Sequence, residues 1–221
     1  MSRLRLVVFD LDGTLVDSSQ DLGAAVNAAL AIVAPGTRAL PTPLVRSLIG
    51  SGARNLVARS LASAGLAHPV DDVLPVFLER YRACLLDRTR PYPGVVESLD
   101  LLADRALAVL TNKPGDMSRA ILSGLGLLGR FFRVYGADDL PTRKPDPAGL
   151  ARLLEEAGAP AGEAAIVGDS AVDVRTGRAA GVFSVGVTYG FDPDSFAADP
   201  PDLLVDDLRT LPERLSLRWP A

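Results

Sequence analysis

Short apolar runs that alternate with helical patterns constrain the fold of this chain more than any other feature. The runs are continuously apolar, which is typical of parallel strands buried on both faces of a sheet. They cover residues 4–9, 106–110, 164–167, 182–187 and 203–205, with a weaker candidate at 133–135. The helical patterns between the later runs cover residues 95–103, 116–125, 148–157 and 173–180. This order predicts an α/β fold with a doubly wound, Rossmann-like parallel sheet.

Residues 16–90 interrupt this alternation. Apolar residues recur there at helical spacing, and no strand is convincing. The helical stretches cover residues 22–33, 55–64 and 73–86. Residues 90–94 contain two prolines and a glycine, which is typical of a linker that returns to the sheet. We therefore expect a catalytic core of residues 1–15 and 91–221, and an all-helical domain, residues 16–90, inserted after the first strand.

The balance of charge argues against nucleic acid as a partner. The 221 residues include 23 basic and 27 acidic side chains, and a net charge of -4 gives no bulk attraction to a phosphate backbone. The longest apolar stretch, 22–34, is shorter than a membrane span, and the run at 6–9 is too short for a signal peptide. The single cysteine, Cys84, makes the fold independent of an oxidising compartment. We expect a cytoplasmic protein without a membrane partner.

Carboxylates follow two of the predicted strands. Asp10 and Asp12 come directly after the first strand, while Asp169 and Asp173 follow the strand at 164–167. Ligands of open α/β sheets bind at this carboxyl edge. The alternative readings are a simple turn at Asp12 and a helix cap at Asp173.

If the two strands are neighbours, these four carboxylates meet, and their repulsion costs several kcal/mol unless a cation neutralises it. Magnesium prefers oxygen ligands and retains bound water, so the sequence predicts a Mg²⁺ site.

Two further segments supply groups that suit phosphate oxygens. Thr111 and Asn112 follow another predicted strand, and Lys144 precedes a proline that begins a helix and so fixes the direction of its stem. The only lysines among the 23 basic residues are Lys113 and Lys144. We expect Lys144 to hold phosphate and Lys113 to matter much less, the alternative for Lys144 being a surface cation.

The sequence argues against several other chemistries. His68, the single histidine, lies beside a proline in an expected exposed loop, which argues against a Ser-His-Asp, Cys-His or His-metal site. The GxGxxG pattern at 124–129 ends a helix instead of following a strand, so it does not indicate a dinucleotide site.

Four motifs in this order resemble those of the haloacid dehalogenase superfamily of phosphotransferases, and the match spans the whole chain. They are DLDGT at 10–14, TN at 111–112, KP at 144–145 and GDSAVD at 168–173. The helical insert resembles the superfamily's first-position cap domain. Further segments resemble the bacterial phosphoglycolate phosphatases within it, namely residues 49–57, 111–114, 139–147 and 188–192. Gln20 replaces a proline found in many relatives and touches no catalytic motif.

The resemblance implies a phosphomonoester hydrolase that forms an aspartyl-phosphate. Asp10 would be the nucleophile. Asp12 would protonate the leaving group and then activate water. The phosphoryl oxygens would be held by Thr111, Asn112 and Lys144.

The resemblance also implies the ligands of a Mg²⁺ ion. A carboxylate oxygen of Asp10, the main-chain carbonyl of Asp12 and the carboxylate of Asp169 would bind it. Asp173 would orient a bound water or Lys144, and Ser170 would help to orient the cluster.

The resemblance names 2-phosphoglycolate as substrate. The carboxylate of this substrate would bind at the turn that begins a cap helix, where Gly50, Gly52 and Arg54 are the candidate contacts. The alternative is an ordinary helix start with a solvent-facing arginine.

Other functions stay open at this point. Another small phosphomonoester, pyrophosphate or a sugar-phosphate mutase reaction would use the same residues. A metal-free 2-haloacid dehalogenase would leave Asp12 and the second acidic cluster without a task. A receiver-like phospho-signalling domain would need neither Asp12 nor the cap. The oligomeric state is open between monomer and homodimer.

Overall fold

The computed structural model describes residues 3–219. Its main element is a six-stranded parallel sheet in the order β5-β4-β1-β6-β7-β8. The strands are β1 (Leu6–Phe9), β4 (Ala106–Leu110), β5 (Arg133–Tyr135), β6 (Ala164–Gly168), β7 (Phe183–Val187) and β8 (Leu203–Val205). The chain runs outward from β1 in one direction and then in the other, which confirms the predicted doubly wound sheet.

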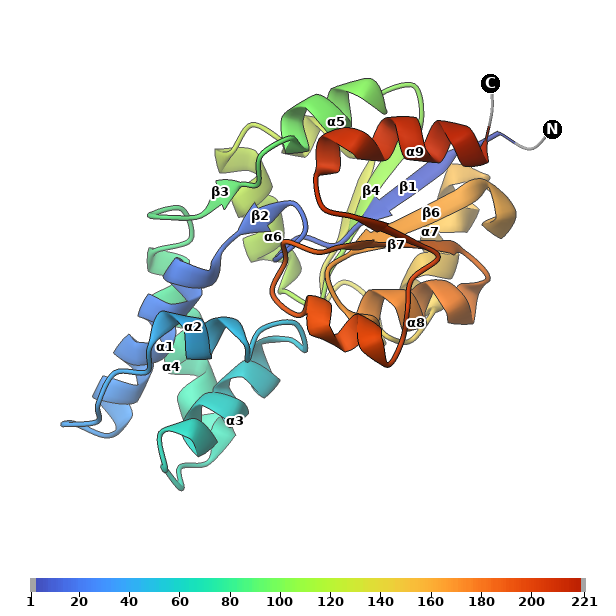
Figure 1. Ribbon diagram of the computed structural model, residues 1–221. Coiled ribbons are helices and arrows are strands. Elements are labelled where there is room, and N and C mark those ends of the chain that lie inside the picture. Colours follow the sequence, from blue (N-terminus) through green and yellow to red (C-terminus); the bar gives the residue numbers. More distant parts are fainter. Residues whose placement is uncertain (1–2, 220–221) are drawn as a thin grey trace.

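Helices cover both faces of this sheet (Figure 1). They are α5 (Val95–Leu101), α6 (Gly115–Gly124), α7 (Ala148–Ala157), α8 (Ala171–Ala180) and α9 (Leu211–Arg218). Val7 and Phe9 of β1 pack into the cluster that contains α5, α6 and α9, while Leu6 and Val8 pack into the cluster that contains α7. Both faces of β1 are therefore buried, which explains its continuous apolar sequence.

Residues 19–83 form the helical insert, which lies beyond the sheet in Figure 1. Its helices are α1 (Ser19–Val33), α2 (Thr42–Arg46), α3 (Ala53–Ser63) and α4 (Val70–Ala83). Apolar residues of these helices form their own core, in which Leu22, Val26, Leu61 and Phe77 are buried. The insert thus has a hydrophobic core of its own, which Met117 of α6 and Phe191 also join.

Two short strands join the insert to the sheet. β2 (Val16–Asp17) and β3 (Arg90–Pro91) pair antiparallel. Close to them, the buried carboxylate of Asp21 accepts hydrogen bonds from the amides of Arg88 and Thr89 at 3.0 and 2.8 Å. The expectation of no strand within residues 16–90 is therefore wrong, because strands of two residues are too short to show a periodicity.

The sequence also missed two helices, α2 and α9. α2 has five residues, and its buried side chain is Val45 alone. α9 buries Leu211 and Leu215, which is too sparse a stripe to identify. His68 lies in an exposed loop, as expected. Within residues 3–219, no helix has the length and apolar character needed to cross a membrane.

Candidate active site

Asp10 and Asp12 lie where the chain leaves β1 at the carboxyl edge of the sheet. Asp10 is 8% exposed, and its Oδ1 accepts a hydrogen bond from the amide of Leu11 at 2.7 Å. Gly13 has a φ of 84°, and a Cβ at this position would collide with the carboxylate of Asp169. Glycine therefore allows the turn after β1 to pack against the end of β6.

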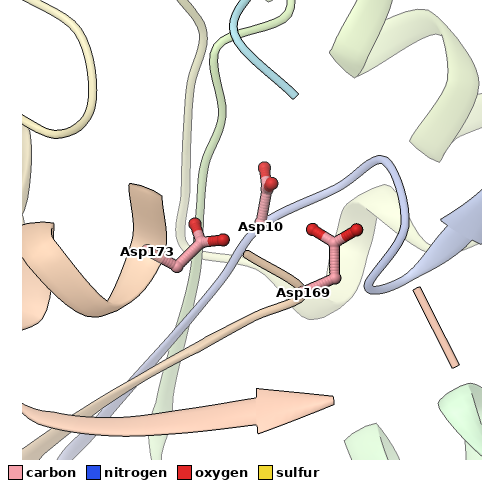
Figure 2. A group of neighbouring side chains, drawn as sticks. All are labelled: Asp10, Asp169 and Asp173. Carbon is pink, nitrogen blue, oxygen red and sulfur yellow. The ribbon is translucent and has the colours of Figure 1, made fainter. Parts of the chain in front are cut away.

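Three carboxylates gather at this edge (Figure 2). Asp10, Asp169 and Asp173 each offer an oxygen, and these oxygens lie within 4.8 Å of one another. The expected fourth member, the carboxylate of Asp12, is not in the group. It turns instead toward Lys113 and toward Ser18, whose hydroxyl donates to Asp12 at 2.5 Å. The prediction of four clustered carboxylates was therefore wrong for one of them.

Lys144 is the ammonium in contact with this cluster. Its Nζ lies 3.0 Å from Asp10 and 2.6 Å from Asp173. Burial lowers the pKa of Lys144, but the attraction of Asp10 and Asp173 outweighs it and raises that pKa overall.

The pKa values of two carboxylates are raised. Burial, opposed by Lys144, raises the pKa of Asp10 to about 6. Burial, and then repulsion from Asp10 and Asp173, raises the pKa of Asp169 well above its ordinary value. Three carboxylates around one ammonium leave an excess of two negative charges when all are ionised. This oxygen-rich, negatively charged cluster fits a divalent cation.

Ser170 and Asp173 form the start of α8. The amide and the hydroxyl of Ser170 donate to the carboxylate of Asp173 at 3.3 and 3.0 Å. The two residues form a capping box, in which the Ser170 side chain accepts from the amide of Asp173 and the Asp173 side chain accepts from the amide of Ser170. Asp169 accepts the amide of Phe191 at 2.6 Å. Asp173 therefore caps the helix, which was the alternative interpretation of this residue, and also pairs with Lys144.

Thr111 and Asn112 lie at the end of β4, and both are buried. The amide group of Asn112 donates to the main-chain oxygen of Lys144 at 3.0 Å, while its Oδ1 has no hydrogen-bond partner among the described residues. The structure therefore brings Thr111 and Asn112 to the same edge as Asp10 and Lys144.

Lys113 lies in the site, although the sequence indicated that it would matter much less than Lys144. Its Nζ donates to the two oxygens of Asp12 at 3.1 and 2.9 Å and to the hydroxyl of Tyr81 at 2.5 Å. Its side chain is 3% exposed. The sequence did set Lys113 apart, because Lys113 and Lys144 are the only lysines of the chain.

A pocket of about 40 Å³ opens beside Asp10 and Asp12, between the sheet and the helical insert. The side chains from the insert that line it are mostly apolar, namely Leu22, Ile49, Ala53, Leu56, Phe77, Leu78 and Tyr81. Gly50 and Gly52 also line it. A Cβ at Gly52, whose φ is 86°, would lie 3.2 Å from the main-chain oxygen of Asn112. This turn of the insert therefore lies close against the sheet.

The structure does not bring Arg54 to this pocket. Its guanidinium pairs with Asp71 of α4, and both side chains are more than half exposed, at 53% and 74%. From the first turn of α3, Arg54 reaches across the outer surface of the insert to Asp71. Arg54 therefore does not line this pocket, and the alternative of a solvent-facing arginine fits its position.

Arg46 of α2 makes a contact that sequence analysis missed. Its guanidinium donates to the main-chain oxygens of Tyr189 and Gly190 at 3.0 and 2.7 Å. The next residue, Phe191, donates its amide to Asp169. Arg46 thus links the insert to the loop that holds one carboxylate of the cluster.

Comparisons with known proteins agree with this geometry. The sequence profile described as haloacid dehalogenase-like hydrolase matches residues 7–187. A phosphoglycolate phosphatase of Pseudomonas fluorescens is 43% identical over 217 residues, which are 94% of this chain and 78% of that protein. One of Rhodospirillum rubrum is 41% identical over 228 residues, covering 98% of this chain and 93% of that protein.

A solved structure extends the similarity to the fold. The crystal structure of a predicted phosphoglycolate phosphatase from Haemophilus somnus superposes with a TM-score of 0.90 at 32% identity, covering 97% of this chain and 99% of that one. The six-stranded parallel sheet and the helices on both its faces are thus shared with that structure. The profile match and the identities above 40% show that this chain belongs to the haloacid dehalogenase-like hydrolase family.

Proposed function

We propose that this chain is a Mg²⁺-dependent phosphomonoester hydrolase that acts through an aspartyl-phosphate at Asp10, with 2-phosphoglycolate as its substrate. The observation that carries the proposal is the position of Asp10. Its carboxylate lies 3.0 Å from the ammonium of Lys144, belongs to the three-carboxylate cluster and lines the small pocket under the insert.

Asp10 is the nucleophile in this scheme. Its carboxylate oxygen attacks phosphorus, the bond from phosphorus to the ester oxygen breaks, and the phosphoryl group is transferred to Asp10. Attack requires the ionised carboxylate, and Lys144 favours that form against the effect of burial. Lys144, Thr111 and Asn112 hold the phosphoryl oxygens as charge develops on them.

Asp12 is the general acid and base. It gives a proton to the leaving ester oxygen and then takes one from the water that attacks the aspartyl-phosphate. Its carboxylate lines the same pocket as Asp10. Contacts with Lys113 and Ser18 hold it there, away from the three-carboxylate cluster.

Asp10, Asp169 and the main-chain oxygen of Asp12 are the proposed ligands of Mg²⁺. When bound, the ion neutralises charge on the carboxylates and on the transferring phosphoryl group. Asp173 holds Lys144 in place, and Ser170 holds Asp173 through the capping box. These contacts place Lys144 and the ligands before the substrate arrives.

Residues 16–90 are the proposed cap domain, and residues 1–15 and 91–221 the catalytic core. The cap supplies most of the apolar wall of the pocket, so closure of the cap over the substrate excludes water from Asp10. The β2–β3 pair and the contacts of Asp21 lie at the two chain crossings where a hinge would act.

The size of the pocket and the names of the relatives support 2-phosphoglycolate. The relatives from Pseudomonas fluorescens and Rhodospirillum rubrum are named phosphoglycolate phosphatase. The pocket is small, at about 40 Å³, which favours a compact leaving group.

A hydrolysis screen tests this function. Phosphate release is measured with Mg²⁺ on a panel of phosphorylated metabolites that includes 2-phosphoglycolate, pyrophosphate and hexose phosphates, with Asp10→Asn as the inactive control. We expect the highest kcat/KM for 2-phosphoglycolate. A higher value for pyrophosphate or a hexose phosphate would contradict the substrate assignment, and no phosphate release from any member of the panel would contradict the activity.

A further inference from the structure

Lys113 connects the sheet to the helical insert through a single buried ammonium. On one side its Nζ donates to Asp12 at 2.9 Å, and on the other side to the hydroxyl of Tyr81 on α4 at 2.5 Å. The same Nζ lies 4.3 Å from the centre of the Tyr81 ring. Burial raises the pKa of Tyr81, so its hydroxyl stays neutral and accepts this hydrogen bond.

Lys113 supplies the positive charge among the described residues that line the pocket. Among the described residues that line the pocket, the charged ones are Asp10, Asp12 and Lys113. Lys144, which lies between Asp10 and Asp173, does not line this pocket, and Arg54 lies on the outer surface. A carboxylate that entered this largely apolar pocket would lose its hydration, which costs several kcal/mol unless a cation pairs with it.

We propose that Lys113 selects the leaving group, by binding with its ammonium a carboxylate that the substrate carries next to the ester oxygen. This assignment rests on the proposed function, because Asp12 marks the position of the ester oxygen only if Asp12 protonates it. In 2-phosphoglycolate one methylene group separates the carboxylate from that oxygen. An ammonium already bound to Asp12 therefore lies within reach of the carboxylate.

Tyr81 positions Lys113 for this contact. Its ring and hydroxyl lie against the ammonium from the side of the insert, so α4 adds to the hold of Asp12 on Lys113 when the insert is close to the sheet. Tyr81 is 1% exposed and stacks on Phe77, with ring centroids 5.9 Å apart. The packing of the insert thus fixes the place where a carboxylate would bind.

The test compares two substrates in the Lys113→Met variant. kcat/KM is measured for 2-phosphoglycolate and for 2-hydroxyethyl phosphate, which has a neutral leaving group of similar size. Both values fall, since Asp12 loses its partner with either substrate, and the ratio of the two values isolates the carboxylate. We expect this ratio to fall about tenfold or more, equivalent to about 1.4 kcal/mol. Arg80→Met, which removes an exposed cation of α4 next to Tyr81, should leave the ratio unchanged.

Two further outcomes are informative. Equal losses for both substrates in Lys113→Met would overturn the assignment and leave Lys113 as a partner of Asp12 alone. If that variant does not fold, Tyr81→Phe decides, because it removes only the hydroxyl that holds the ammonium. A severalfold fall in the ratio supports the inference, and an unchanged ratio overturns it.

Different results would contradict the proposed function and the role of Lys113. A wild-type enzyme that does not prefer 2-phosphoglycolate to 2-hydroxyethyl phosphate would contradict the proposed substrate before any variant is made, and the role of Lys113 would fall with it. A wild-type preference that survives unchanged in Lys113→Met would overturn the role of Lys113 alone.

Discussion

Lys113 and Lys144 are the two lysines of a chain whose other basic residues are arginines, and both are buried at the candidate site. Each ammonium contacts carboxylates in a confined space. Lys144 lies between Asp10 and Asp173, and Lys113 lies between Asp12 and Tyr81. A guanidinium is larger and planar, so these two positions require the compact charge of lysine.

The Lys144→Arg variant tests this requirement. The Lys144 side chain is 2% exposed and has a contact of 2.6 Å with Asp173, so a guanidinium would displace Asp10 or Asp173. We expect kcat for 2-phosphoglycolate to fall by about 100-fold or more, in line with the loss of one preorganised donor at a transition state. Steady-state kinetics measure it, with circular dichroism as the check on folding. A kcat within a few fold of wild type would show that charge alone suffices.

The raised pKa of Asp10 predicts how stability depends on pH in the metal-free protein. A folded-state pKa of about 6, above the ordinary 3.8, means that folding favours the protonated carboxyl group. The stabilising contribution is complete below about pH 4 and is lost as pH rises through about 6. Urea unfolding in EDTA should show this decline for wild type and a weaker one for Asp10→Asn. The same decline in both proteins would assign it to other groups.

Sequence reasoning predicted the meeting of Asp10, Asp169 and Asp173, because the ends of neighbouring parallel strands share one edge. It also placed Asp12 in this cluster, which was wrong, and expected Arg54 at the turn that receives a second anion, whereas Arg54 does not line the pocket. The direction of a side chain depends on partners distant in sequence, here Lys113 for Asp12 and Asp71 for Arg54. No local pattern identifies such partners.

At the scale of elements, the sequence predicted the strands and helices that have strong apolar patterns and missed the short ones. The predicted strands at 106–110, 133–135 and 203–205 and the helix at 148–157 have the observed bounds. Continuous apolar runs and helical spacing identify such elements directly. The β2–β3 pair and α2 are stabilised by tertiary contacts rather than by a periodic pattern, and Arg46 of α2 was missed for the same reason.

Asp21 is the residue on which the junction between the insert and the sheet depends. Its buried carboxylate accepts the amides of Arg88 and Thr89 and the hydroxyl of Thr89. Asp21→Ala leaves these donors without a partner, and we expect the free energy of unfolding to fall by about 3 kcal/mol. Urea unfolding measures it. Glu79→Ala, an exposed change on α4, should stay within about 0.5 kcal/mol of wild type. A loss at Asp21 no larger than that at Glu79 would contradict this role.

At the scale of the whole molecule, the site is complete only where the sheet, the insert and the loop at 189–191 meet. Each supplies part of it. The carboxylates and Lys144 come from segments that follow strands of the sheet, most of the apolar wall comes from the insert, and the amide bound to Asp169 comes from the loop. The sequence predicted the sheet and its edge. The closeness of the insert, which leaves a Cβ on Gly52 only 3.2 Å from the main-chain oxygen of Asn112, depends on the assembled fold.

This arrangement predicts a requirement for a divalent cation. The excess negative charge of the cluster and the raised pKa of Asp169 indicate that the ionised site needs a partner ion. We expect activity to disappear after exhaustive chelation, to return with Mg²⁺ and in part with Mn²⁺, and to be blocked by excess Ca²⁺, whose looser coordination misplaces Asp10. Phosphate release measures each case. Full activity after chelation would contradict the metal site.

Trapping the reaction intermediate tests the central claim most directly. Wild-type protein is mixed with 2-phosphoglycolate and Mg²⁺, quenched within a turnover and treated with borohydride, which reduces an aspartyl-phosphate to homoserine. Peptide mass spectrometry then locates the change. The mechanism proposed here predicts homoserine at position 10 of wild type and at no position of Asp10→Asn. Homoserine at another aspartate, or turnover of 2-phosphoglycolate without any reduced residue, would contradict the assignment of Asp10 as the nucleophile.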